Sequence, residues 1–284
     1  MGTTSIEWAD ATWNVVTGCT KVSPGCKNCY AEKIAKRFWG ERKFSDVRCH
    51  PDRLDQPLHW KKPSRIFVNS MSDLFHEALS NEQIAKVFNV IRRCYNERGG
   101  HRFIILTKRP GRMVELLPRL RFCSAGAGRT YFADSPHAGN YPLAAGHRGA
   151  TGLTNVWLGV SCENQETADE RIPLLLQTPA AHRFVSLEPL LGPIDLNTVD
   201  ALGLRQDGAA WTDFGASSCL DWVIVGAESG PGARPCNVDW IRSIVEQCRE
   251  AQVPVFVKQD FGPRPGKQGR IPNDLWIKEF PDGF

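Results

Sequence analysis

Short runs of apolar and β-branched residues recur along the chain, with few polar positions inside them. Such runs are typical of strands that are buried on both faces of a parallel sheet. Seven strands are predicted, at Trp13–Thr17, Arg65–Asn69, Arg102–Thr107, Asn155–Ser161, His182–Leu187, Asp221–Gly226 and Val253–Lys258. Helical patterns lie between them, at Tyr30–Phe38, Asn81–Arg98 (with Ser80 as N-cap), Arg109–Leu117, Asn164–Gln177 and Asn237–Ala251. Because strand and helix alternate, the sequence predicts parallel βαβ units.

Several stretches interrupt this alternation. Arg119–Thr154 and Asn197–Ser218 show no hydrophobic period and are predicted to be loop insertions. The polar stretch between Gly40 and Pro63 predicts an irregular crossover, and the Pro/Gly-rich tail Phe261–Phe284 predicts an extension along the surface. With 284 residues the chain is long enough to bury a sizeable core, and we expect one domain over residues 1–284.

The composition is that of a soluble globular protein, with 42% hydrophobic and 23% charged residues. No apolar run reaches 18 residues, and Met1–Trp8 lacks the basic and apolar regions of a signal peptide. We therefore expect a cytoplasmic protein without a membrane partner. The net charge of +4 permits an anionic partner but does not require one.

Polar side chains follow every predicted strand at its carboxyl end. They are found at Cys19, Ser70–Asp73, Thr107–Arg109, Ser161–Asn164, Ser186–Glu188, Glu228–Ser229 and Lys258–Gln259. In a barrel these ends converge on one mouth, whereas in a doubly wound open sheet they spread along a rim. We predict an α/β fold with a partial (β/α)6-type barrel, loop insertions and one extra strand. The alternative is that these positions are polar only because strands end there.

Three of the ten cysteines, Cys19, Cys26 and Cys29, have the spacing C-x6-C-x2-C, with a Pro–Gly turn in the first gap. Three thiolates suit zinc or an iron–sulfur cluster. A structural zinc site or a ferredoxin-type cluster takes four protein ligands, and Cys49 or His50 offers a fourth. A [4Fe–4S] cluster with three cysteine ligands instead leaves one iron open to a cofactor. We favour this open cluster and keep zinc, a structural cluster and unligated thiols as alternatives.

The cysteine-containing segment Trp13–Glu32 resembles the opening of a phage-associated three-cysteine-motif family, which is counted with the radical S-adenosylmethionine proteins. The resemblance continues at Asn69–Phe75, Leu106–Pro110, Trp157–Ser161, Ser186–Leu190, Gly226–Gly230, Ala233–Pro235 and Lys258–Gln259. The wider superfamily has the spacing C-x3-C-x2-C with an aromatic residue before the last cysteine. Here the first gap has six residues, and the aromatic Tyr30 follows Cys29. The resemblance implies a radical S-adenosylmethionine enzyme on a TIM-like barrel.

The resemblance also implies roles for individual residues. Cys19, Cys26 and Cys29 would ligate a [4Fe–4S] cluster that cleaves S-adenosylmethionine, and the radical formed would abstract hydrogen from a substrate. The residues expected to bind S-adenosylmethionine are Ser70, Ser72, Asp73, Ser161, Glu163, Asn164, Glu188 and Glu228. Glu188 and Lys258 are the catalytic candidates, since a carboxylate that closes an apolar strand needs a partner or a ligand. Capping the next helix is the alternative for Asp73, Glu163 and Asn164.

Four cations near the predicted mouth, Lys108, Arg109, Arg234 and Lys258, would favour an anionic substrate such as a nucleotide or nucleic acid. The alternative is that these cations neutralise the four carboxylates Asp73, Glu163, Glu188 and Glu228. The reaction would also need an electron donor such as a flavodoxin or ferredoxin. The alternative function is a nucleic-acid-binding module, in which zinc or a structural cluster only staples the N-terminal loop. The sequence leaves the substrate and the oligomeric state open.

Overall fold

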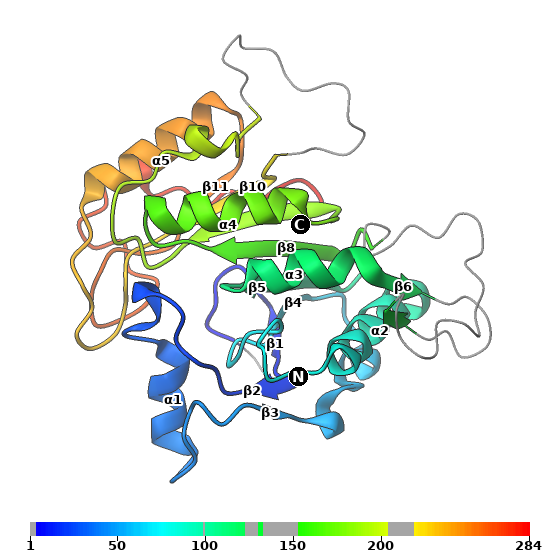
Figure 1. Cartoon of the computed structure of the whole chain (residues 1–284). Helices are drawn as coiled ribbons and strands as arrows, with labels where there is room; N and C mark the ends of the chain where they lie inside the picture. Colours follow the sequence, from blue (N-terminus) through cyan, green and yellow to red (C-terminus); the bar gives the residue numbers. More distant parts are fainter. Residues whose placement is uncertain (1–3, 99, 123–129, 133–152, 204–218) are drawn as a thin grey trace. The chain divides into compact units, whose positions relative to one another are not determined.

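Seven parallel strands form the central sheet of the computed structural model, which describes residues 4–98, 100–122, 130–132, 153–203 and 219–284 (Figure 1). The strands are β1 (Ala11–Trp13), β4 (Arg65–Val68), β5 (Arg102–Thr107), β8 (Val156–Ser161), β9 (His182–Leu187), β10 (Trp222–Val225) and β11 (Val255–Val257). Their order is β1-β4-β5-β8-β9-β10-β11, so each new strand is added on the same side of the last. A doubly wound sheet reverses its order once, and this sheet does not. The predicted α/β fold with a partial barrel is confirmed.

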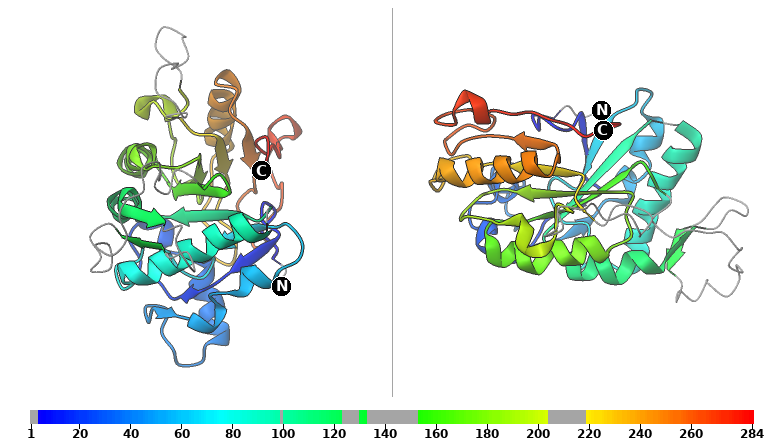
Figure 2. Two further views of the ribbon diagram at one scale, coloured as in Figure 1. Left: turned by 90° about the vertical axis from the view of Figure 1, so that its right-hand side faces the viewer. Right: turned by 90° about the horizontal axis from the view of Figure 1, so that it is seen from above.

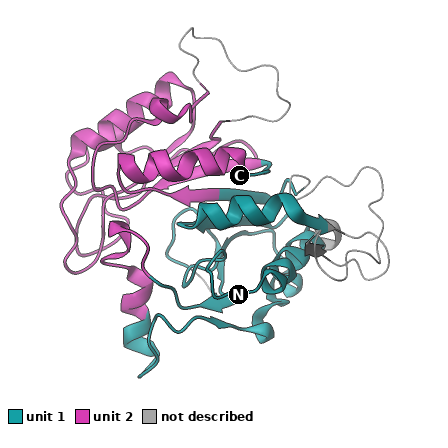
Figure 3. Ribbon diagram, in the orientation of Figure 1, with its two compact units in different colours: residues 1–20, 35–158, 178–181 teal, residues 21–34, 159–177, 182–284 magenta. Residues whose placement is uncertain are grey.

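The chain divides into two compact units, coloured in Figure 3. Unit 1 comprises residues 1–20, 35–158 and 178–181, and unit 2 comprises residues 21–34, 159–177 and 182–284. Strand β8 runs through both, because its first three residues belong to unit 1 and its last three to unit 2. Helix α1 (Tyr30–Phe38) is divided in the same way.

Unit 1 holds β1, β4 and β5, with helices α2 (Asn81–Arg98) and α3 (Pro110–Leu116). Ser80 caps α2 as predicted, since its hydroxyl accepts from the Gln83 amide at 3.2 Å and the Gln83 side chain accepts from the Ser80 amide at 2.8 Å. This reciprocal capping box pairs two amides that the first turn of a helix leaves unpaired. The core of the unit includes Trp13 and Phe103, fully buried with ring centroids 5.8 Å apart.

Unit 2 holds β9, β10 and β11, with helices α4 (Gln165–Gln177) and α5 (Val238–Glu250), which can be followed in Figure 2. Its core contains the fully buried side chains of Phe184, Trp222 and Phe256. A Cβ on Gly159 of β8 would lie 2.5 Å from the ring of Phe184, so only glycine lets this ring pack against the strand. Because these strands are packed on both faces, their sequences are nearly continuous apolar runs.

The first predicted strand, Trp13–Thr17, is wrong in its bounds. Strand β1 ends at Trp13, and the side chain of Asn14 accepts hydrogen bonds from the Ser70 hydroxyl and the Met71 amide at 3.2 and 3.1 Å. The chain then leaves the parallel sheet, and β2 (Val16–Thr17) pairs antiparallel with β3 (Arg48–Cys49). The predicted run is thus divided at Asn14, whose side-chain oxygen finds partners outside the strand.

The stretches predicted as irregular contain short elements. The 3-10 helices of the described chain are Pro24–Cys26, Pro51–Arg53, Gln56–His59, Leu117–Arg119, Leu196–Val199 and Asn273–Leu275. Strands β6 (Leu120–Phe122) and β7 (Thr130–Phe132) pair antiparallel inside the first predicted insertion. Residues 123–129 and 133–152 of that insertion and residues 204–218 of the second lie outside the described residues. Within the described ranges, no helix has the length and hydropathy needed to cross a membrane.

Candidate functional site

The residues predicted at strand ends do follow the carboxyl ends of the parallel strands. In unit 1, Ser70–Asp73 follow β4 and Lys108 follows β5. In unit 2, Glu163 follows β8, Glu188 follows β9 directly, and Glu228 and Lys258 come after β10 and β11. The parallel register places such residues at the same edge of the strands within each unit. The cysteine segment is held at this edge in both units, as the contacts below show.

In unit 1, the backbone before Cys19 is fastened to the loop after β4. The Gly18 amide donates to the Met71 carbonyl at 3.0 Å, and the Ser72 hydroxyl donates to the Gly18 carbonyl at 2.7 Å. Gly18 has a φ of +96°, and a Cβ there would lie 2.5 Å from the carbonyl oxygen of Asp46. Only glycine suits both the left-handed backbone and this close approach. The Ser72 side chain therefore positions the backbone segment that carries Cys19, called the Cys19 arm below.

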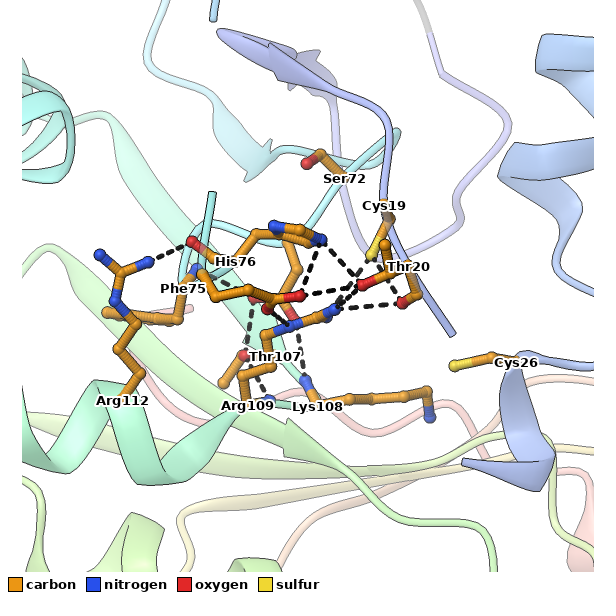
Figure 4. A network of polar contacts seen from close by, with 12 residues as sticks. Cys19, Thr20, Cys26, Ser72, Phe75, His76, Thr107, Lys108, Arg109 and Arg112 are labelled. Atoms are coloured by element: carbon orange, nitrogen blue, oxygen red, sulfur yellow. Dashed lines mark hydrogen bonds and ion pairs between the residues drawn. The ribbon is translucent and has the colours of Figure 1, made fainter. Parts of the chain in front are cut away.

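Arg109 joins the Cys19 arm to the end of β5, as Figure 4 shows. Its Nη1 donates to Cys19 Sγ at 3.5 Å and to Asp73 Oδ2 at 3.4 Å, and its Nε donates to Glu77 Oε2 at 2.8 Å. Its Nη2 donates to the carbonyl and hydroxyl oxygens of Thr20 at 3.1 and 2.8 Å. Burial disfavours the charged guanidinium, but Asp73, the Cys19 sulfur and Glu77 outweigh it and raise the pKa of Arg109.

Asp73, predicted as a ligand of S-adenosylmethionine or as a helix cap, is buried in a cage of donors. Its Oδ1 accepts from the Thr107 hydroxyl at 2.8 Å and the Phe75 amide at 2.9 Å. Its Oδ2 accepts from the Lys108 amide at 3.1 Å, in addition to Arg109. Asp73 does not cap α2, which begins eight residues later, so the capping alternative is wrong for this residue. The carboxylate instead ties the end of β4 to the end of β5.

In unit 2, two strand-end carboxylates hold the loop that carries Cys26 and Cys29. Glu163 Oε1 accepts from the Gly25 amide at 3.1 Å, and Glu228 Oε2 accepts from the Asn28 side chain at 2.8 Å. A Cβ on Gly25 would lie 2.9 Å from the Glu163 carboxyl carbon, so glycine allows the loop to approach. Two of the carboxylates predicted to bind a cofactor therefore position the cysteine loop.

Glu163 is also half of a buried ion pair that was not predicted from the sequence. Its side chain is 0% exposed, and Arg171 of α4, 3% exposed, donates to Oε2 at 3.1 Å. The same nitrogen donates to the Ser161 carbonyl at 2.7 Å. Asn164 accepts from the Thr167 amide at 3.1 Å, so it starts α4 and the capping alternative is confirmed for this residue.

Glu228 forms the second anchoring pair. Arg234 donates to Oε1 from Nη2 at 2.6 Å and to Oε2 from Nε at 2.9 Å, and its Nη1 reaches the Pro24 carbonyl at 3.1 Å. Burial disfavours the ionised carboxylate, but the hydrogen bonds from Arg234 and Asn28 outweigh it and lower the pKa of Glu228 to about 2. The ionised form is therefore the one that holds the cysteine loop.

This low pKa predicts an acid-sensitive contribution to stability. The pKa is lower in the folded chain than the ordinary value of 4.5, so the contribution is complete above that value and is lost as the pH falls towards 2. Up to about 3 kcal/mol is expected from a shift of this size. Urea unfolding at several pH values should show Glu228→Gln much less stable than wild type at pH 7 and similar to it near pH 2. A difference in the free energy of unfolding that stays constant with pH would contradict the prediction. Glu246→Gln, which changes an exposed carboxylate, is the control.

Glu188 and Lys258, the catalytic candidates, contact each other at the ends of β9 and β11. Lys258 Nζ donates to Glu188 Oε2 at 3.2 Å and lies 3.1 Å from Oε1 as an ion pair. Glu188 Oε1 is buried and accepts no hydrogen bond among the described residues. A Cβ on Gly226 would come within 2.7 Å of this oxygen, so glycine leaves the space beside it. Glu188 thus keeps an acceptor without a hydrogen bond at the strand ends.

Comparison with known proteins gives the family of the chain. A family model described as a protein of unknown function, DUF5131, matches residues 3–271. The chain belongs to this family. No curated protein and no solved structure matches it. The predicted link of the DUF5131 chain to radical S-adenosylmethionine chemistry therefore depends on its own residues and fold.

The donor set of this DUF5131 member fits a cluster with three thiolate ligands. Cys19, Cys26 and Cys29 are free thiols, and all three residues are half-buried. Burial raises the pKa of the Cys29 thiol. Among the described residues, no group of three or more histidine, cysteine, aspartate and glutamate side chains could hold a metal ion as placed, and this includes the three thiols. The chemistry of the donors fits the predicted cluster, and metal binding itself stays a prediction.

The remaining predicted residues of the DUF5131 site have protein partners. Ser161 donates to the Glu188 carbonyl at 3.0 Å, and Ser70 donates to the Asn14 side chain. Neither Asn28 nor Arg171 was predicted from the sequence as a residue of the site. A signal for Arg171 exists, because it lies on the otherwise apolar face of α4 with Ala168, Ile172 and Leu175. For Asn28 no such signal exists, since its partner Glu228 is 200 residues away.

Proposed function

We propose that this member of the DUF5131 family is an enzyme that holds a [4Fe–4S] cluster through Cys19, Cys26 and Cys29 and uses it with S-adenosylmethionine. One observation carries the proposal: the thiol-bearing segment is fastened to the carboxyl ends of the parallel strands in both units. In barrel enzymes of parallel strands, reactive groups gather at these ends. A structural staple does not require this placement.

When bound and reduced by one electron, such a cluster would supply reductive cleavage of S-adenosylmethionine to methionine and a 5′-deoxyadenosyl radical that takes hydrogen from a substrate. The residues of the chain hold and orient the parts. Asp73 and Arg109 fix the Cys19 arm, and Glu163 and Glu228 fix the loop of the other two cysteines. Glu188 offers its acceptor to the amine or a ribose hydroxyl of S-adenosylmethionine.

We assign no substrate, because most of the cations at the strand ends are paired with carboxylates. Three of the cations expected to attract an anionic substrate are paired: Arg109 with Asp73, Arg234 with Glu228, and Lys258 with Glu188. The pairing supports the neutralising alternative for these three, so a nucleotide or nucleic-acid substrate is not needed to explain them. The electron would come from a protein donor, for which we expect a flavodoxin or ferredoxin.

The test is anaerobic reconstitution of the full chain with iron and sulfide. We expect a brown protein with about four iron and four sulfide per chain and broad absorbance near roughly 400 nm. Addition of dithionite and S-adenosylmethionine should then yield 5′-deoxyadenosine, measured by mass spectrometry. A colourless protein that carries one zinc per chain would refute the proposal and support the metal-stapled binding module.

Glu188→Gln separates a role in cofactor binding from a role in holding the cluster. The substitution keeps the size of the side chain and removes the charge that pairs with Lys258. We expect unchanged iron content and an affinity for S-adenosylmethionine lowered by about tenfold, which corresponds to about 1.4 kcal/mol. Equilibrium binding to the reconstituted protein measures it. Wild-type affinity and turnover in this variant would return Glu188 to a purely structural role.

A further inference from the structure

The strongest unexplained arrangement outside the predicted ligand set is the guanidinium beside a cysteine sulfur in unit 1 (Figure 4). The Arg109 side chain is 9% exposed, and five hydrogen bonds from it fix Cys19, Thr20, Asp73 and Glu77. Burial of a long cationic side chain is costly unless it is paired and hydrogen-bonded. A salt bridge alone would need only the two carboxylates. The additional contact with the sulfur is what needs an explanation.

We propose that Arg109 is a positioning residue that acts through Cys19 and raises the reduction potential of the cluster. This inference rests on the proposed function, since it assigns a regulator to the same site. The Nη1–Sγ distance of 3.5 Å is suitable for an N–H···S hydrogen bond, and the donor carries a fixed positive charge. Hydrogen bonds to ligand sulfurs and the net charge nearby are among the properties that set cluster potentials.

The direction of the effect follows from charge. A [4Fe–4S] cluster takes one electron from an external donor when it is reduced, and so becomes more negative by one charge. A cation held at a ligand sulfur stabilises the more negative state, which raises the potential. Removal of Arg109 would also leave Asp73 and Glu77 without their shared counter-charge. Both changes disfavour the added electron.

The Asp73 cage keeps this test free of gross misfolding. Without Arg109, the Asp73 carboxylate retains three donors: the Thr107 hydroxyl and the amides of Phe75 and Lys108. Glu77 is 65% exposed, so water replaces its lost partner. The loop after β4 is also held to Gly18 by backbone and Ser72 contacts that do not involve Arg109. Arg109→Gln should therefore fold and load, with a changed potential.

Glu77 provides a substitution of the opposite sign. In Glu77→Gln the amide oxygen can still accept from Arg109, while one negative charge that offsets the guanidinium is removed. The potential should then rise. Arg112→Gln is the matched control, because Arg112 lies three residues further along, donates to the carbonyls of His76 and Leu79, and does not bond Cys19 in any described contact.

The experiment is a redox titration of the reconstituted full chain, followed by visible absorbance and electron paramagnetic resonance, with iron content measured in parallel. Arg109→Gln should shift the midpoint about 59 mV more negative, a tenfold change in the one-electron equilibrium. Glu77→Gln should shift it to less negative values, and Arg112→Gln, which removes a charge that does not bond the sulfur, should shift it much less than Arg109→Gln. A merely structural role for Arg109 would not move the two potentials in opposite directions.

Each outcome decides between explanations. A loaded wild type with unshifted Arg109→Gln and Glu77→Gln overturns this inference and leaves the proposed function standing. A wild type that takes up no cluster overturns the proposed function and this inference with it. If Arg109→Gln takes up no iron, Arg109→Lys and Glu77→Gln decide. A loaded Arg109→Lys with a midpoint more negative than that of wild type, together with a Glu77→Gln shifted to less negative values, supports the proposal. An unshifted Glu77→Gln refutes it.

Discussion

Replacement of Cys26 by alanine is expected to abolish the formation of 5′-deoxyadenosine and to bleach the reconstituted protein. A cluster held by three cysteines has no spare protein ligand, so the loss of one leaves two iron-binding sulfurs. Changes in residues around metal ligands commonly lower metal affinity or activity ~10–100-fold. Loss of a ligand itself should lower product formation more than about 100-fold. Iron content and product formation, measured anaerobically on the same sample, check this prediction.

The fold should tolerate this substitution. Cys26 ends the 3-10 helix Pro24–Cys26, whose backbone contacts to Ser23 and Glu163 do not use the thiol. Cys26→Ala should therefore unfold at the same urea concentration as wild type. Full product yield from this variant would refute the ligand assignment.

Cys49→Ala is the matched control for the cysteine experiment. Cys49 is another half-buried free thiol, on β3, and it is the residue that could complete a four-ligand zinc site. An open iron–sulfur cluster predicts wild-type iron and product in this variant. If Cys49→Ala loses its metal together with Cys26→Ala, four ligands are in use and the metal is structural.

Local features of the fold could be predicted from the sequence, because they depend on neighbours along the chain. The bounds of β9 match the predicted run His182–Leu187, and the capping box at Ser80 formed as expected. The alternation of strands and helices also predicted a parallel sheet, which the structure confirms. The strand predicted at Trp13–Thr17 failed because the partners of Asn14 lie 56 and 57 residues away.

The composition of the candidate site could be predicted, but its pairings could not. The sequence placed charged residues at the strand ends, with four cations against four carboxylates. It left open whether these charges bind a ligand or one another. The distances answer this for Arg234 and Lys258, which lie 2.6 and 3.1 Å from Glu228 and Glu188. Glu163 pairs instead with Arg171, a residue that helical spacing alone does not connect to the cysteine loop.

The buried pair of Glu163 and Arg171 predicts a large loss of stability when one partner is removed. Arg171→Met removes the charge and keeps much of the apolar stem, so Glu163 is left ionised at 0% exposure without its cation. Breaking a buried pair from one side typically costs about 3–5 kcal/mol, because the remaining charge is uncompensated. The loss should appear as a lower midpoint of urea unfolding at pH 7 with an unchanged slope.

Two further variants show whether the cost comes from the stranded carboxylate. The double variant Glu163→Gln with Arg171→Met should be more stable than Arg171→Met alone, since it removes the unpaired charge. Glu170→Gln, which changes an exposed carboxylate beside the same arginine, should stay within about 0.5 kcal/mol of wild type. Glu163 also accepts from the Gly25 amide, in the loop that carries Cys26 and Cys29. Arg171→Met should therefore reduce iron uptake even at urea concentrations at which the chain is still folded. An Arg171→Met protein as stable as wild type would contradict the prediction, because it would show that this buried pair contributes no net stability to the fold.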